Sequence, residues 1–131
     1  MSNPLKVMVV EDESVVAQHI CEELLKVGDI KVVVSGSGTE AIEFAKINQP
    51  DMALIDIDID ISTDRINSVK TAAKLQRLAK SPMLIVFTLT YPASHFPLAG
   101  PVDPYIYLNK PFSSEDLKVI LQKAVEIKEQ V

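Results

Sequence analysis

The sequence predicts a doubly wound α/β domain, in which helices cover both faces of a five-stranded parallel sheet. Three observations predict this fold. Short apolar runs alternate with stretches of helical periodicity, the runs are continuous, and 131 residues leave room for a single core. Strand–helix alternation gives right-handed crossovers with helices on both faces of the sheet. Ligands of such sheets bind beyond the carboxyl ends of the strands, so the residues after each apolar run are the first candidates for a site.

The expected elements follow from periodicity and from residues that start or stop helices. Continuous apolar runs predict five strands at residues 6–10, 30–34, 52–55, 83–87 and 105–108. Helical spacing predicts four helices at residues 14–27, 39–47, 66–79 and from about 113 to near the C-terminus. Gly28 ends the first helix, Thr39 caps the second, and Ser113 with Asp116 forms a capping pair for the last.

The segment between the fourth and fifth strands contains four prolines, Pro92, Pro97, Pro101 and Pro104. A proline inside a helix removes a hydrogen bond and clashes with the preceding turn at a cost of about 3 kcal/mol. We therefore expect the fourth crossover helix to be shortened or irregular, with at most one turn around residues 93–96. The hydrophobic residues Phe96, Leu98 and Val102 are expected to cover the sheet from this segment.

Charge, cysteine content and the length of the apolar runs indicate which partners and which compartment suit this protein. Lys and Arg number 13 against 18 Asp and Glu, a formal net charge of −5, which argues against nucleic acid or an anionic membrane as a partner of this domain. The single cysteine, Cys21, fits a reducing compartment. No apolar run approaches the roughly 20 residues of a membrane-spanning helix. We expect a cytoplasmic domain that occupies residues 1–131.

Four of the apolar runs end in side chains suited to metal or phosphate chemistry: Glu11 and Asp12, Asp56, Thr88, and Lys110. The carboxyl ends of parallel strands meet at one edge of a sheet, so we expect these groups to converge. Crowded carboxylates repel one another, and Mg²⁺ can hold them ionised while needing only one or two of them. A metal beside a lysine and a hydroxyl is what phosphoryl transfer requires. Pro111 follows Lys110, and a cis bond there would direct the lysine.

Each residue also has a structural explanation. Asp12 can be a first-turn acid that the helix dipole favours, and Asp56 with Asp58 can belong to a solvated strand face. Lys110 alone can be a surface lysine. The combination at successive strand ends favours a functional site over these separate explanations.

The segments VMVVEDE, PDMALIDI, MLIVFT and YIYLNKPF resemble, in this order and spacing, those of receiver domains of two-component response regulators. The resemblance covers essentially the whole chain and implies strand order 2-1-3-4-5. It also implies a phosphoacceptor domain that at most catalyses its own phosphorylation and dephosphorylation. The expected partners are a sensor histidine kinase or a histidine phosphotransfer protein, with an output domain or a homodimer in addition. The chain can stand alone or be the N-terminal part of a longer protein.

The resemblance assigns roles to individual residues. Asp56 resembles the phosphoacceptor, Asp12 a direct Mg²⁺ ligand and Glu11 its outer-shell companion, while Asp58 would offer its backbone carbonyl to the metal. The remaining roles concern the phosphoryl group and the switch: Lys110 would pair with the phosphoryl oxygens, Thr88 would move in to hydrogen-bond them, and Tyr107 would turn inward behind Thr88.

The sequence departs from the family pattern directly after Thr88. Leu89 follows Thr88 where a small residue is usual, which suggests restricted access to the phosphoryl group. A shifted alignment makes Thr90 the switch hydroxyl, although Thr88 directly ends the apolar run.

Three other readings remain open. The segment 36–41 fits a G-x-G-x-x-A dinucleotide-binding fingerprint, but the chain has no room for a substrate domain. Glu11 with Asp56 and Asp58 imitates a Toprim-like nuclease, which the acidic charge disfavours. A receiver-like scaffold that is never phosphorylated is the main alternative.

Overall fold

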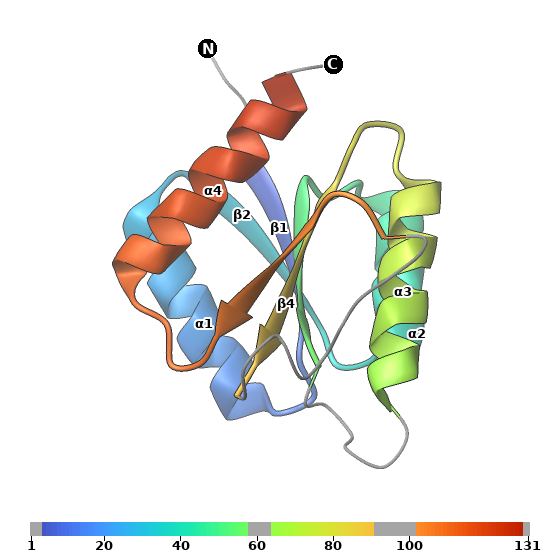
Figure 1. Ribbon diagram of the computed structural model, residues 1–131, viewed down its shortest axis with the longest axis horizontal. Coiled ribbons are helices and arrows are strands. Elements are labelled where there is room, and N and C mark those ends of the chain that lie inside the picture. The colour runs from blue at the N-terminus through green and yellow to red at the C-terminus, as the bar shows by residue number, and fades with distance from the viewer. Residues whose placement is uncertain (1–3, 58–63, 91–101, 130–131) are drawn as a thin grey trace.

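The computed structural model describes residues 4–57, 64–90 and 102–129, and of residues 64–67 it describes the backbone. Five parallel strands form one sheet in the order β2-β1-β3-β4-β5, as expected: β1 (Leu5–Val10), β2 (Ile30–Ser35), β3 (Met52–Asp56), β4 (Leu84–Leu89) and β5 (Tyr105–Asn109). Four helices accompany them in the described part of the chain: α1 (Ser14–Val27), α2 (Gly38–Ile47), α3 (Asp64–Leu78) and α4 (Ser114–Glu129) (Figure 1). The doubly wound prediction is confirmed.

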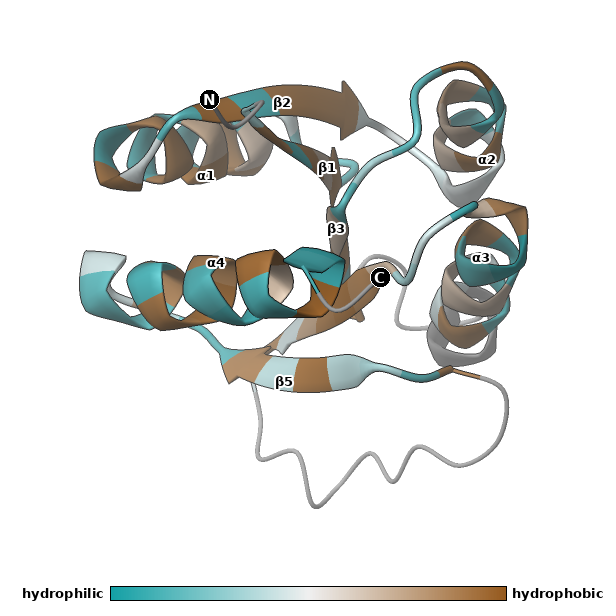
Figure 2. Cartoon of the chain, turned by 90° about the horizontal axis from the view of Figure 1, so that it is seen from above, coloured by the Kyte–Doolittle hydropathy of each residue, from teal (hydrophilic) through white to brown (hydrophobic). Residues whose placement is uncertain are grey.

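Two hydrophobic cores lie on the two faces of the sheet. Seen from above, α1 and α4 cover one face, and α2 and α3 cover the other (Figure 2). Successive strand residues point to opposite faces, so Leu54 and Val86 pack on the α1 and α4 side, whereas Ile55 and Phe87 pack on the α2 and α3 side. Every residue of β3 and β4 is buried. This accounts for the continuous apolar runs that these strands show in the sequence.

Several boundaries differ from the sequence-based expectation. β3 extends through Asp56, because its ladder with β4 continues to the pair Asp56 and Thr88. β4 extends to Leu89, which pairs with Asn109 of β5. The expectation that Asp56 and Thr88 follow their strands is therefore wrong: both lie within them. Ser37, not Thr39, is the N-cap of α2, since its hydroxyl accepts from the Glu40 N–H at 3.1 Å.

The expected capping pair of the last helix is confirmed. The Asp116 carboxylate accepts from the Ser113 N–H at 2.9 Å, and the Ser113 hydroxyl accepts from the Asp116 N–H at 3.1 Å. The prediction of a shortened fourth crossover helix falls on residues 91–101, outside the described residues, as do Phe96 and Leu98. Val102 is described, and it is buried in the core on the α2 and α3 side.

Gln76 of α3 binds three backbone groups, from two segments of the chain, through its side-chain amide. Its Nε2 donates to the carbonyls of Met83 at 2.9 Å and Pro104 at 3.0 Å, and its Oε1 accepts from the Asp103 N–H at 2.9 Å. Because replacement by alanine leaves these groups without partners, we expect Gln76→Ala to lower the free energy of unfolding by about 2 kcal/mol. Chemical denaturation measures this. The control Gln122→Ala, on the exposed face of α4, should change stability by less than about 0.5 kcal/mol, and equal effects would contradict the prediction.

Candidate functional site

Asp56 and Lys110 form an ion pair at the carboxyl edge of the sheet. The Lys110 ammonium lies 2.9 Å from Asp56 Oδ1, and the side chains are 22% and 8% exposed. The backbone of Lys110 is fixed to the end of β4, because its N–H donates to the Leu89 carbonyl at 2.8 Å. The Lys110–Pro111 peptide bond is cis, as the sequence predicts. The fold thus brings together two oppositely charged residues that are 54 positions apart in the chain.

Glu11 is the second buried carboxyl of this edge. It directly follows β1, its residue is 4% exposed, and its N–H donates to the Ser35 carbonyl at 2.9 Å. Its Oε2 accepts from the Glu13 N–H at 3.2 Å, whereas Oε1 has no hydrogen-bond partner among the described residues. Burial, together with the neighbouring Asp56 carboxyl, raises the pKa of Glu11 to about 8. Two carboxyls therefore crowd one another beside the Lys110 ammonium.

This donor set fits a hard divalent cation. Glu11 and Asp56 offer two neighbouring carboxyls, and the unpartnered Oε1 of Glu11 is an acceptor that a cation or its bound water can satisfy. Asp12 is exposed, and its proximity is a smaller cause of the raised pKa of Glu11. No three acidic, His or Cys side chains among the described residues form a ready-made metal cage, but Mg²⁺ needs only one or two carboxylates and keeps several waters. Asp58 lies outside the described residues.

The two candidate switch threonines differ in their surroundings. Thr88 is 2% exposed and stands beside Asp56 in the parallel ladder between β3 and β4. Thr90 follows the strand and is exposed. This geometry favours Thr88 over Thr90 as the hydroxyl near Asp56.

Tyr107, in β5, packs in an aromatic group next to β4. Its ring centroid lies 6.1 Å from that of Phe87 and 5.6 Å from that of Tyr105. Burial raises the pKa of Tyr107, and Tyr105 raises it further. Leu89 is fully buried among the hydrophobic residues of the α2 and α3 side. It is a core side chain in this structure, and its expected effect on access to the phosphoryl group stays a prediction.

Sequence reasoning missed Ser68. This residue of α3 is 6% exposed, and its hydroxyl donates to the Asp56 carbonyl oxygen at 3.4 Å. A single serine in a helical stretch carries no signal of such a contact, because the contact depends on how α3 packs against the end of β3.

The G-x-G-x-x-A segment has a structural explanation. Gly36 donates its N–H to the Glu40 carboxylate at 3.3 Å, and Glu40 donates its own N–H to Ser37 Oγ. The start of α2 is therefore capped by its own side chains. A Cβ at Gly38 would collide with the Thr71 hydroxyl of α3, so this glycine permits close packing of α2 against α3. These contacts favour a packing role over dinucleotide binding.

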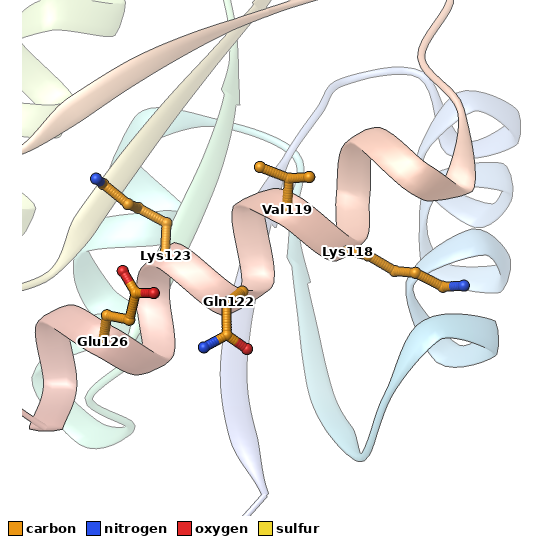
Figure 3. Close-up of a pocket in the computed structure, with 5 residues that line it drawn as sticks. All are labelled: Lys118, Val119, Gln122, Lys123 and Glu126. Carbon is orange, nitrogen blue, oxygen red and sulfur yellow. The ribbon is translucent and has the colours of Figure 1, made fainter.

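A shallow hollow of about 400 Å³ lies on the outer face of α4 (Figure 3). Its lining consists of Lys118, Val119, Gln122, Lys123 and Glu126. All five come from one helix face and are exposed, which is typical of a solvated surface. The hollow contains no residue of the site around Asp56.

Comparison with known proteins identifies the family of this chain. The family model of the response regulator receiver domain matches residues 7–122. The transcriptional regulatory protein PdtaR of Mycobacterium tuberculosis is 28% identical over 122 residues, which cover 93% of this chain and 57% of PdtaR. The chain thus spans little more than half the length of this relative.

Solved structures resemble the fold. A CheY-like response regulator receiver domain from Methanospirillum hungatei JF-1 has a TM-score of 0.78 at 20% identity, covering 98% of this chain and 100% of that one. The receiver domain of a sensor histidine kinase from Pseudomonas aeruginosa, with a magnesium ion in its active-site cleft, has a TM-score of 0.70 at 21% identity, covering 95% and 99%. In the part of this chain that is described, no helix is long and apolar enough to cross a membrane. With a family model matched over most of its length, the chain belongs to the response regulator receiver domain family of two-component signalling.

Proposed function

We propose that this receiver domain accepts a phosphoryl group on Asp56 from the phosphohistidine of a sensor histidine kinase or a histidine phosphotransfer protein. The ion pair of Asp56 with Lys110 beside the crowded Glu11 is the observation that carries the proposal. A structural ion pair does not need a second buried carboxyl with an unpartnered oxygen. A phosphoryl site needs a divalent cation to neutralise charge, and such a carboxyl can help to hold that cation.

Among the residues of this domain, only the acceptor Asp56 would form a covalent bond during phosphoryl transfer. A carboxylate oxygen of Asp56 attacks phosphorus and forms the acyl phosphate, while the bond between phosphorus and the imidazole nitrogen of the donor breaks. The electron pair of that bond leaves with the imidazole, which is released as the free histidine. Lys110 would then pair with the phosphoryl oxygens in place of the carboxylate, and its cationic head would offset their charge.

Mg²⁺ would be held by Asp12 and Asp56 directly and by Glu11 through water, with the backbone carbonyl of Asp58 as a further ligand. When bound, the ion neutralises charge on the transferring phosphoryl oxygens. The likeness to a magnesium-containing receiver domain supports this assignment.

Phosphorylation would switch the conformation through Thr88 and Tyr107. A phosphoryl group adds about two negative charges and three strong acceptors next to Asp56. The Thr88 hydroxyl, one strand away, would turn to donate to these oxygens. Tyr107, next to Phe87 on the neighbouring strand, would turn inward behind Thr88 and change the surface around β5.

The wider setting is also a proposal. The domain extends over residues 1–131 and acts in the cytoplasm as a phosphoacceptor, with no activity beyond its own phosphorylation and dephosphorylation. An output domain or a second copy of the chain would read the switched state, and neither nucleic acid nor membrane would bind to this domain.

Intact mass after incubation with acetyl phosphate tests the proposal. We expect the mass of one phosphoryl group to be added in the presence of Mg²⁺ and not after chelation with EDTA. Because acyl phosphates are reduced by borohydride, peptide mapping after reduction should locate the modification at Asp56. A protein that gains no mass under these conditions would instead be a receiver-like scaffold that phosphorylation does not regulate.

A further inference from the structure

The carbonyl oxygen of Asp56 accepts a hydrogen bond from a side chain of α3, the helix that follows β3. The pairing between β1 and β3 ends at Ile55, one residue before Asp56. The buried hydroxyl of Ser68, in α3, donates to this oxygen at 3.4 Å. Ser68 thereby supplies a hydrogen bond at the point where the sheet on that side has ended.

The next N–H along the chain, that of Ile57, forms a hydrogen bond with β4. Ile57 donates its N–H to the Thr88 carbonyl at 3.0 Å. The Asp56 carbonyl and the Ile57 N–H belong to one planar peptide group, so Ser68 and Thr88 hold both polar atoms of the same plane. Rotation of this plane would change the backbone at Asp56 and turn its carboxylate relative to Lys110, whose ammonium lies 2.9 Å away.

We propose that Ser68 is a positioning residue for Asp56: it fixes the peptide plane after Asp56 so that the carboxylate points at Lys110 and at an incoming phosphoryl group. The inference rests on the proposed function of Asp56. Ser68 itself would touch neither the phosphoryl donor nor the metal. Because acceptor geometry must be kept within about 0.5 Å and 10–20°, loss of this single contact should slow phosphorylation far more than it destabilises the fold.

The chain provides a matched control on the same helix. Thr71 lies one turn after Ser68 and is also buried, but its hydroxyl faces Gly38 of α2. Ser68→Ala and Thr71→Val each remove one buried hydroxyl from α3, and only the first removes the contact with the Asp56 carbonyl. Ser68→Thr keeps the hydroxyl. Ser68→Cys keeps a side chain of similar volume but has a weaker hydrogen-bond donor. It replaces Ser68→Ala in the test if Ser68→Ala does not fold.

Two measurements on the full chain test the inference. With acetyl phosphate and saturating Mg²⁺, we expect the rate of phosphorylation to fall about tenfold in Ser68→Ala, to be intermediate in Ser68→Cys, and to be largely restored in Ser68→Thr. In the unphosphorylated protein, we expect amide hydrogen exchange at Ile57 to be faster in Ser68→Ala than in wild type. The Thr71→Val variant should match wild type in both measurements.

The outcomes separate this inference from the proposed function. If wild type gains no phosphoryl group, the proposed function fails and the inference fails with it, even where exchange at Ile57 shows the contact. If wild type is phosphorylated, the inference alone is overturned when Ser68→Ala reacts within about twofold of wild type, when Thr71→Val slows as much, or when exchange at Ile57 does not change.

Discussion

The Asp56→Asn variant is expected to lose phosphorylation completely while its fold is retained. Asparagine has the same shape but a neutral amide that cannot form an acyl phosphate. Removing one of two crowded carboxyls also relieves the repulsion between Asp56 and Glu11, which contributes to the raised pKa of Glu11. The same change also removes the ion pair with Lys110, so we expect the two effects to offset one another and the free energy of unfolding without Mg²⁺ to change by less than about 1 kcal/mol.

Asp51→Asn is the matched control. Asp51 precedes β3 at the opposite edge of the sheet, and it also pairs with a lysine, since its Oδ2 lies 3.3 Å from Lys128 Nζ. Its carboxylate also accepts from the Lys6 N–H at 2.9 Å. This variant should keep full phosphorylation by intact mass and lose stability by thermal unfolding. An Asp56→Asn protein that still gains the full phosphoryl mass would remove Asp56 as the acceptor.

The Lys110→Met variant is expected to lose both stability and reactivity. The methionine keeps much of the apolar stem, so the change removes mainly the ammonium. Asp56 and Glu11, both buried, then lack the only cation that is shown to pair with Asp56 among the described residues. Breaking a buried pair leaves an uncompensated charge, and we expect a loss of about 2 kcal/mol, less than in a fully buried pair because Lys110 is 22% exposed. Phosphorylation should slow by about 10²-fold, since a charge that stabilises the phosphoryl oxygens is lost.

Lys118→Met is the control that shows how much stability and reactivity change when any surface lysine is replaced by methionine. Lys118 pairs with Glu115 at 3.2 Å on the surface of α4, where both side chains are more than half exposed. Such pairs contribute little, so this variant should change stability by less than about 0.5 kcal/mol and leave phosphorylation unchanged.

A double-mutant cycle completes the test of the ion pair. Lys110→Met should cost less stability in the Asp56→Asn background than in wild type, because the carboxylate that pairs with Lys110 is absent there. An equal cost in both backgrounds would show that Lys110 stabilises the fold through packing and not through Asp56.

The sequence by itself determined the architecture and most of the candidate site. Continuous apolar runs predicted the five strands, helical spacing predicted the described helices within a few residues, and the groups at strand ends pointed to Glu11, Asp56 and Lys110 as candidates. These inferences succeed because burial on both faces of a parallel sheet leaves a direct mark on composition, and because parallel strands bring their carboxyl ends to one edge. Strand order came from family resemblance, since periodicity does not encode the order.

Only the tertiary structure decided contacts that depend on register and packing. The ladder between β3 and β4 places Thr88 beside Asp56 and leaves Thr90 exposed. The packing of α3 brings Ser68 to the Asp56 carbonyl, and the end of β1 buries Glu11 with one oxygen unpartnered. Each of these contacts joins residues whose separation in the chain exceeds the span of any local pattern, or depends on a neighbour's position across the sheet. A pattern along one strand or helix carries no information about which atom of another element lies opposite, and that information arises only when the elements pack.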